Sequence, residues 1–240
     1  MCYRRLITEV FTDTLHVSVK SKRGNRYVQA FATAFCWYCV HPMEKNPNAH
    51  DGLSTMFARD GVPNFLIMNN SEKQILGDFR RKSRVADFWI RQTYPYPPWS
   101  NAEEAAIREL KKGSARKMLR KKSPKRLWDE CMELEAYIQF HRANGHPHLE
   151  GEVPETLISG ETADISEFAK HRWYDWIKFH DTTVAYPESK LVLGRYLVPS
   201  TEIGPAMTAK IIKANGQYAH RSTLRALTQD DTDSPEELAS

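Results

Sequence analysis

The first half of the chain alternates apolar and polar positions, then changes to helical spacing. Residues 4–17 alternate residues such as Leu6 and Val10 with polar ones, which predicts a strand ending near Asp13. A turn signal at 21–25 and an aromatic, β-branched stretch at 26–40 predict two further strands in hairpin order. The chain therefore begins with three consecutive strands.

Two more strands and two helices are predicted after this hairpin. Apolar residues at helical spacing predict a short helix over 48–60. The Gly-Val-Pro sequence that follows is expected to end this helix. The apolar run 65–68 is typical of a buried parallel strand, with Asn69 at its carboxyl end. A helix over 72–86 and a strand over 87–91 follow.

A proline-rich connection precedes the most charged part of the chain. Prolines between Tyr94 and Trp99 exclude helix there, and Ser100 with Glu103 forms a capping box. We therefore expect a helix from about Asn101 that holds Glu104 in its first turn. A further helix is predicted over 125–142.

The last hundred residues have a different pattern. Residues 146–172 show little periodicity and are interpreted as a linker. Short strand-like runs separated by Pro, Gly and Asp predict a small all-β, barrel-like module over 173–227. The acidic, unpatterned residues 228–240 predict a disordered tail. The predicted strand runs are 173–180, 190–198, 206–213 and 218–222.

Composition restricts the class of protein. Of 240 residues, 41% are hydrophobic and 27% charged, which is enough apolar material for a packed core of one domain plus a smaller module. The chain shows no apolar run of signal-peptide or membrane-spanning length, so we expect neither secretion nor a membrane partner. Four scattered cysteines fit a reducing compartment, the nucleus or cytoplasm.

Two of the cysteines leave two interpretations open. Cys36 and Cys39 have the spacing of half a zinc site, with His41 and His50 downstream, but no second pair completes four ligands. The alternative is that both cysteines are small hydrophobic residues of a strand.

Positive charge is concentrated in one stretch. The net charge is only +4, yet residues 101–126 contain ten Lys or Arg against three Glu. Basic residues at helical intervals would form a ridge that binds DNA phosphates without reading sequence. A solvated helix face or a nuclear-localisation patch is the alternative. The candidate DNA-binding residues are Arg108, Lys111, Lys112, Arg116, Lys117 and Lys121.

The predicted element order is that of the ribonuclease H-like α/β fold, a five-stranded mixed sheet flanked by helices. Phe11-Thr12-Asp13-Thr14 resembles the first-acid strand of copia-like retrotransposon integrases, a group within the retroviral-type integrase family. Residues 95–104 resemble the family's segment with the final glutamate. Residues 151–160 and 191–197 are similar to later family signatures, so the resemblance extends over most of the chain.

The resemblance implies a metal-dependent D,D-35-E triad that is degenerate here. Asp13 and Glu104 match the first and last acids, and Asn69 stands where the family has its second aspartate, with 34 residues between Asn69 and Glu104. Asp13 and Glu104 would bind Mg²⁺ (or Mn²⁺) for phosphoryl transfer. Asn69 removes a negative charge, so we expect weakened metal binding and impaired catalysis.

The resemblance also implies DNA as a partner and a homo-oligomer. Such integrases carry an upstream zinc-binding module, while only 12 residues precede Asp13, so we expect a fragment or decayed copy. Three functions stay open: a nucleic-acid-binding integrase remnant, an active polynucleotidyl transferase that tolerates Asn69, and a noncatalytic interaction module on the same fold.

Overall fold

The structure, a computed structural model, describes residues 4–68, 77–92, 100–145, 149–187, 189–200, 203–204 and 207–228; the side chains of 100–104 are not included. The chain divides into two compact units. The first comprises Met1–Arg116 and Pro124–Ala163, and the second comprises Lys117–Ser123 and Asp164–Ser240.

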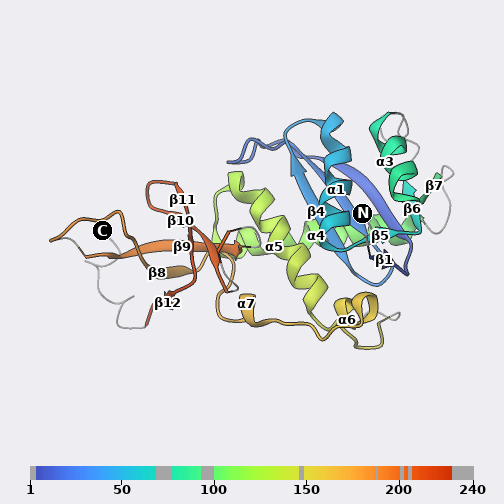
Figure 1. Ribbon diagram of the computed structural model, residues 1–240. Helices are drawn as coiled ribbons and strands as arrows, with labels where there is room; N and C mark the ends of the chain where they lie inside the picture. The colour runs from blue at the N-terminus through green and yellow to red at the C-terminus, as the bar shows by residue number, and fades with distance from the viewer. Residues whose placement is uncertain are drawn as a thin grey trace. The chain divides into compact units, whose positions relative to one another are not determined.

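The first unit is built on a five-stranded mixed sheet, as predicted (Figure 1). Its strand order is β4-β3-β2-β6-β7. β2, β3 and β4 pair antiparallel, whereas β6 pairs parallel with both β2 and β7. The five strands are β2 (Val10–His16), β3 (Tyr27–Ala32), β4 (Tyr38–Met43), β6 (Phe65–Met68) and β7 (Trp89–Gln92).

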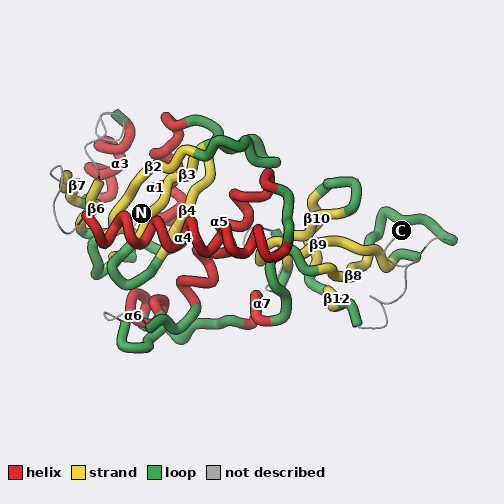
Figure 2. Tube along the Cα trace, turned by 180° about the vertical axis from the view of Figure 1, so that it is seen from behind, coloured by secondary structure: helices red, strands yellow, loops and turns green. Residues whose placement is uncertain are grey.

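Helices cover both faces of this sheet. The two opposite views show α1 on one face and α4 on the other (Figures 1 and 2). Leu53, Met56 and Phe57 of α1 pack with Phe79 of α3 and with apolar residues of the central strands in one core cluster. The helices are α1 (Ala49–Arg59), α3 (Asp78–Ala86), α4 (Ser100–Lys121) and α5 (Trp128–His141), preceded at two places by the 3-10 turns η1 (Asn46–Asn48) and η2 (Lys125–Leu127).

The predicted first strand is broken in two. Arg5–Leu6 forms β1, which pairs parallel with β5 (Val62–Pro63), and the chain bends before β2 begins at Val10. The alternation of residues 4–17 does not reveal this break, because both pieces keep the same period.

A glycine lets α4 approach α5 closely. A Cβ on Gly113 would lie 2.1 Å from Oε1 of Glu135, so only glycine leaves room for this buried carboxylate. Next to it, the Ser114 carbonyl accepts a hydrogen bond from Cys131 Sγ at 3.5 Å. The two helices therefore pack as one layer.

An ionic cluster ties the β2–β3 loop to the start of α5. Arg23 Nε lies 2.9 Å from Asp129 Oδ2 and 3.2 Å from Glu130 Oε1, and its Nη2 lies 2.9 Å from Glu133 Oε2. The side chains of Asp129 and Glu130 are fully buried. Three carboxylates thus share one guanidinium, an arrangement that local sequence patterns do not predict.

The region predicted as a linker contains two short helices, α6 (Pro154–Ser159) and α7 (Ser166–Ala169). Pro154 stands at the start of α6, where its missing amide hydrogen costs nothing. His141 Nε2 of α5 lies 3.5 Å from Glu155 Oε2, which joins α6 to the first unit. The predicted domain limits themselves stay a prediction.

The second unit is a five-stranded antiparallel sheet of order β11-β10-β9-β8-β12. Its core consists of alternate residues, among them Phe179, Tyr196 and Ile211, which are fully buried. Four strands match the predicted runs, but β12 was not predicted. The strands are β8 (Trp176–His180), β9 (Leu191–Pro199), β10 (Ala209–Lys213), β11 (Tyr218–Arg221) and β12 (Leu224–Ala226).

The predicted tail, apart from Thr228, lies outside the described residues. Of the helices in the described ranges, none combines the length and apolar character that crossing a membrane requires.

Candidate functional site

Asp13 lies in the middle of β2, not at the strand end that its sequence pattern predicts. β2 continues to His16 because its pairing with β3 extends through Asp13↔Ala30 to His16↔Tyr27. On its other side, the described pairing with β6 extends to Thr12↔Met68. Asp13 therefore directly follows the last residue of β2 that pairs with a described residue of β6.

Asp13 belongs to the sheet face opposite α1. Val10 and Phe31, the partner of Thr12, lie in the core cluster with α1, so Val10 and Thr12 point to the α1 face. Because strand residues alternate between faces, Asp13 points to the opposite face. Asp13 is partly buried, and its Oδ1 accepts a hydrogen bond from the Thr14 amide at 2.8 Å. Its carboxylate thus lies on the face that α4 covers (Figure 2).

A buried polar network on the other face holds this part of β2. Gln29 Nε2 donates to Thr12 Oγ1 at 2.5 Å, and Thr14 Oγ1 donates to Gln29 Oε1 at 2.6 Å. Thr12 Oγ1 also donates to the Ala30 carbonyl at 3.0 Å. These side-chain bonds across β2 and β3 restrict the backbone on both sides of Asp13, the rigid support that a precise ligand requires.

The other two candidate triad residues follow β6 and begin α4. Asn69 lies outside the described residues, directly after Met68. Glu104 is the fifth residue of α4, which begins at Ser100, so it directly follows the first turn of the helix, in which it was predicted to lie. Its side chain is not described. The structure thus orders the three residues along β2, β6 and α4 without giving the distances between their side chains.

Cys36 and Cys39 lie in different local structures. Cys36 lies in the turn before β4 with φ 56°, and Cys39 is fully buried within β4. Burial raises the pKa of both thiols, that of Cys39 to about 12. Within the described ranges, no three His, Cys, Asp or Glu side chains are grouped as a metal site. The buried position of Cys39 in β4 agrees with the interpretation that it is a small hydrophobic residue of a strand.

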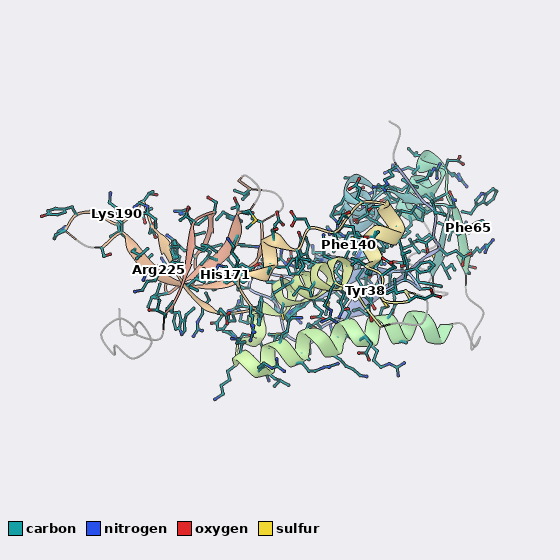
Figure 3. The ribbon with its side chains drawn as sticks, turned by 90° about the horizontal axis from the view of Figure 1, so that it is seen from below. Tyr38, Phe65, Phe140, His171, Lys190 and Arg225 are labelled. Atoms are coloured by element: carbon teal, nitrogen blue, oxygen red, sulfur yellow. The ribbon has the colours of Figure 1, made fainter. Side chains whose placement is uncertain are left out.

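The candidate DNA-binding residues of α4 divide into two groups. Arg108, Lys111, Lys112 and Arg116 are exposed, and Figure 3 shows side chains projecting from the free surface of this helix. Glu109 is the one acid among them; it lies 2.9 Å from Lys112 and 3.6 Å from Arg116. We call the four exposed cations the α4 ridge. The ridge retains a clear positive excess.

Lys117 and Lys121 differ from the ridge. Both are partly buried, and Lys121 Nζ forms an ion pair with Asp175 inside the second unit. Helical geometry explains this, because positions 110, 114, 117 and 121 fall on one face and Leu110 and Ser114 are buried. These two lysines are therefore less suited to phosphate contact than the ridge.

A cavity that sequence patterns did not indicate lies between α3 and β7. Its volume is about 540 Å³, and it is lined by Arg80 and Arg84 of α3 and by Trp89, Ile90 and Gln92 of β7. The only sequence signal was the pair of arginines four residues apart, which is common on solvated helices.

A scan of protein-family models found no match, and a search of curated proteins found none either. Solved structures do match. A chain from the simian T-cell lymphotropic virus intasome is similar at 15% identity and a TM-score of 0.53, covering 95% of this chain and 82% of that one.

Isolated integrase cores match the first part of the chain. The catalytic core domain of BIV integrase has 12% identity and a TM-score of 0.50, covering 63% of this chain and 93% of its own. The HTLV-2 integrase catalytic core domain, solved in complex with magnesium, has 13% identity and a TM-score of 0.50, with coverage of 65% and 99%. At such identities the likeness concerns the fold. This chain has the ribonuclease H-like fold of retroviral integrase catalytic cores, followed by a five-stranded antiparallel all-β sheet.

Proposed function

We propose that this chain is an integrase-derived nucleic-acid-binding protein of a copia-like retrotransposon, whose ancestral reaction, metal-dependent DNA integration, is impaired by Asn69. The observation that carries the proposal is the register of β2 and β6. Thr12 pairs with Met68, and the residues that directly follow are Asp13 and Asn69. An acid and an amide thus follow paired positions on neighbouring parallel strands.

The third candidate, Glu104, belongs to the helix that covers the Asp13 face of the sheet. Mg²⁺ and Mn²⁺ prefer oxygen ligands, and the side chains of Asp13, Asn69 and Glu104 all end in carboxylate or amide oxygens. The ligand atoms of these three residues are therefore suitable for such an ion. The three residues have two negative charges where an Asp-Asp-Glu set has three. Because affinity for a divalent ion depends on ligand charge, we expect weak binding.

A divalent ion at this site would polarise phosphoryl oxygens and activate the attacking hydroxyl or water. The chain's own residues orient the site. The Thr14 amide holds one oxygen of Asp13, and the Thr12–Gln29 network fixes the strand beneath it. Asn69 can supply a neutral carbonyl oxygen but no charge, which lowers the attraction of the site for a divalent metal.

Restoring the acid tests the catalytic part of this proposal. Asn69→Asp should acquire Mn²⁺- or Mg²⁺-dependent joining of a DNA 3′-hydroxyl to a target duplex, and Mn²⁺ should raise its melting temperature more than that of the unaltered chain. The matched control is Asn69→Asp with Asp13→Asn, which should show neither effect. Robust joining by the unaltered chain would instead favour the active transferase.

DNA binding depends on the α4 ridge. The four exposed cations should bind phosphates with little sequence preference, and removing one cation that neutralises a phosphate should reduce the salt slope of log K by about 0.9. Lys111→Ala tests this, with Lys45→Ala, which removes another exposed lysine directly before η1, as its control. Binding that is independent of salt and of Lys111 would favour a noncatalytic interaction module instead. A nuclear location and self-association are parts of the same proposal.

A further inference from the structure

The outer edge of the first unit's sheet carries backbone groups without a strand partner in the described part of the chain. β7 is the last strand in the order β4-β3-β2-β6-β7. The Trp89 amide donates to the Asn64 carbonyl at 2.9 Å, so Trp89 and Arg91 direct their backbone groups toward β6. In a parallel ladder the alternate residues, Ile90 and Gln92, direct theirs outward. Such an edge can accept another strand.

The cavity between α3 and β7 lies along this edge. Ile90 and Gln92 line it together with Arg80 and Arg84. Its volume of about 540 Å³ is within the range of pockets that hold ligands. The edge is therefore a lined groove that leaves room for side chains of an added strand.

The groove is positively charged. Arg80 and Arg84 are exposed, and the structure gives neither an ion pair with a described residue. The one acid in the lining, Asp87, lies 3.7 Å from Arg5, whose Nη1 also donates to the Asp87 carbonyl at 2.6 Å. Two guanidinium groups are therefore available to an anionic partner.

The two sides of the edge differ in chemistry. α3 lies on the α1 side of the sheet, because its Phe79 belongs to the same core cluster, and this side carries the arginines. Ile90 packs against the core cluster on the α1 side. Trp89 is the next residue along β7, so it points to the opposite side, as does its partner Phe65 on β6. The Trp89 side chain is 72% exposed. Figure 3 labels Phe65 at this end of the unit.

The spacing of the arginines matches an extended chain. Arg80 and Arg84 are four positions apart on the helix, a rise of about 6 Å. Two residues of a strand advance about 6.8 Å and return to the same face. Acids at alternate positions of an added strand would therefore meet both arginines. The residue between them would point to the other face, toward Trp89.

We propose that the β7 edge binds an extended acidic peptide as a sixth strand, with alternate carboxylates on Arg80 and Arg84 and an apolar side chain between them on Trp89. The outward edge offers both donors and acceptors, which a peptide backbone satisfies and a phosphate chain, having only acceptors, does not. This site does not depend on the proposed DNA binding.

The test uses the full chain and a fluorescein-labelled peptide, Ser-Glu-Val-Glu-Val-Glu-Ser, in a polarisation titration. Arg80→Glu with Arg84→Glu should weaken binding about tenfold or more, since each exposed ion pair contributes up to ~1 kcal/mol. Lys45→Glu with Lys125→Glu, which changes two exposed cations outside the groove, is the charge-matched control and should leave peptide affinity unchanged. A peptide with Lys in place of Glu should not bind.

Backbone methylation of the peptide separates strand addition from simple charge attraction. N-methylation of one alternate set of residues should abolish binding, whereas methylation of the other set should not, because only one set directs its amides at β7. Equal tolerance of both sets, or equal binding of the Lys peptide, would overturn the proposal. So would a single-stranded DNA that competes fully and loses affinity in the Arg80→Glu, Arg84→Glu variant, because the groove would then be a nucleic-acid surface.

Discussion

Replacing Glu133 by Gln should remove a pH dependence of the first unit's stability. Glu133 shares the Arg23 guanidinium with the fully buried Asp129 and Glu130. Burial raises the pKa of Glu133 from 4.5 to about 7. The positive charge of Arg23 opposes this rise only in part, and the negative charge of Glu130 adds to it. The folded state therefore binds a proton between about pH 4.5 and 7 that the unfolded state has released.

Stability consequently falls as pH rises through this window, because the folded state holds more protons than the unfolded one. At 1.36 kcal/mol per pKa unit the loss is at most ~3 kcal/mol. The Glu133 side chain is 27% exposed, and solvent screening makes this value an upper limit. Gln is neutral at every pH and keeps an oxygen that can accept from Arg23.

The assay is urea unfolding at pH 5 and at pH 8, followed by amide exchange of α5 so that the first unit is observed separately. Glu133→Gln should match the unaltered chain at pH 5 and exceed its free energy of unfolding at pH 8. Parallel pH profiles of the two proteins would refute the reasoning, since the titrating group would then lie elsewhere.

Two further predictions follow from packing. Gly194→Ala should destabilise the second unit by about 1–3 kcal/mol in thermal unfolding, because its Cβ would lie 2.7 Å from Ile211 and 2.8 Å from Phe179, both fully buried; unchanged stability would show that this core can rearrange. Cys39 should react with a thiol reagent at pH 8 only when the protein unfolds, since burial raises its pKa to about 12, and rapid labelling in the folded protein, monitored by mass spectrometry, would contradict its buried position.

The sequence alone was sufficient for the ribonuclease H-like fold class and most element positions. The helix α1 and the apolar strand β6 were predicted within one or two residues, because periodicity and turn residues are local properties. The five-stranded mixed sheet followed from element order. β12 escaped prediction, since three residues, Leu224–Ala226, are too short to show a period.

Pairing and burial decided what the sequence could not. The place of Asp13 inside β2 follows from the pairing of that strand with β3, which extends to His16 and is a property of two separate segments. Lys121 looks like a ridge residue in a charge pattern, yet helix packing directs it to Asp175.

The Arg23 cluster and the groove beside β7 were likewise invisible in the sequence. Arg23 meets Asp129 only because the β2–β3 loop folds against α5. Arg80 lines a groove at the sheet edge only because β7 is the last strand of the sheet among the described residues. The sequence by itself determined most of the segments that form helices and strands, and which segments carry acids and cations. Tertiary structure decided which of these groups meet, because charge pairing and edge exposure depend on distances in space that no local pattern encodes.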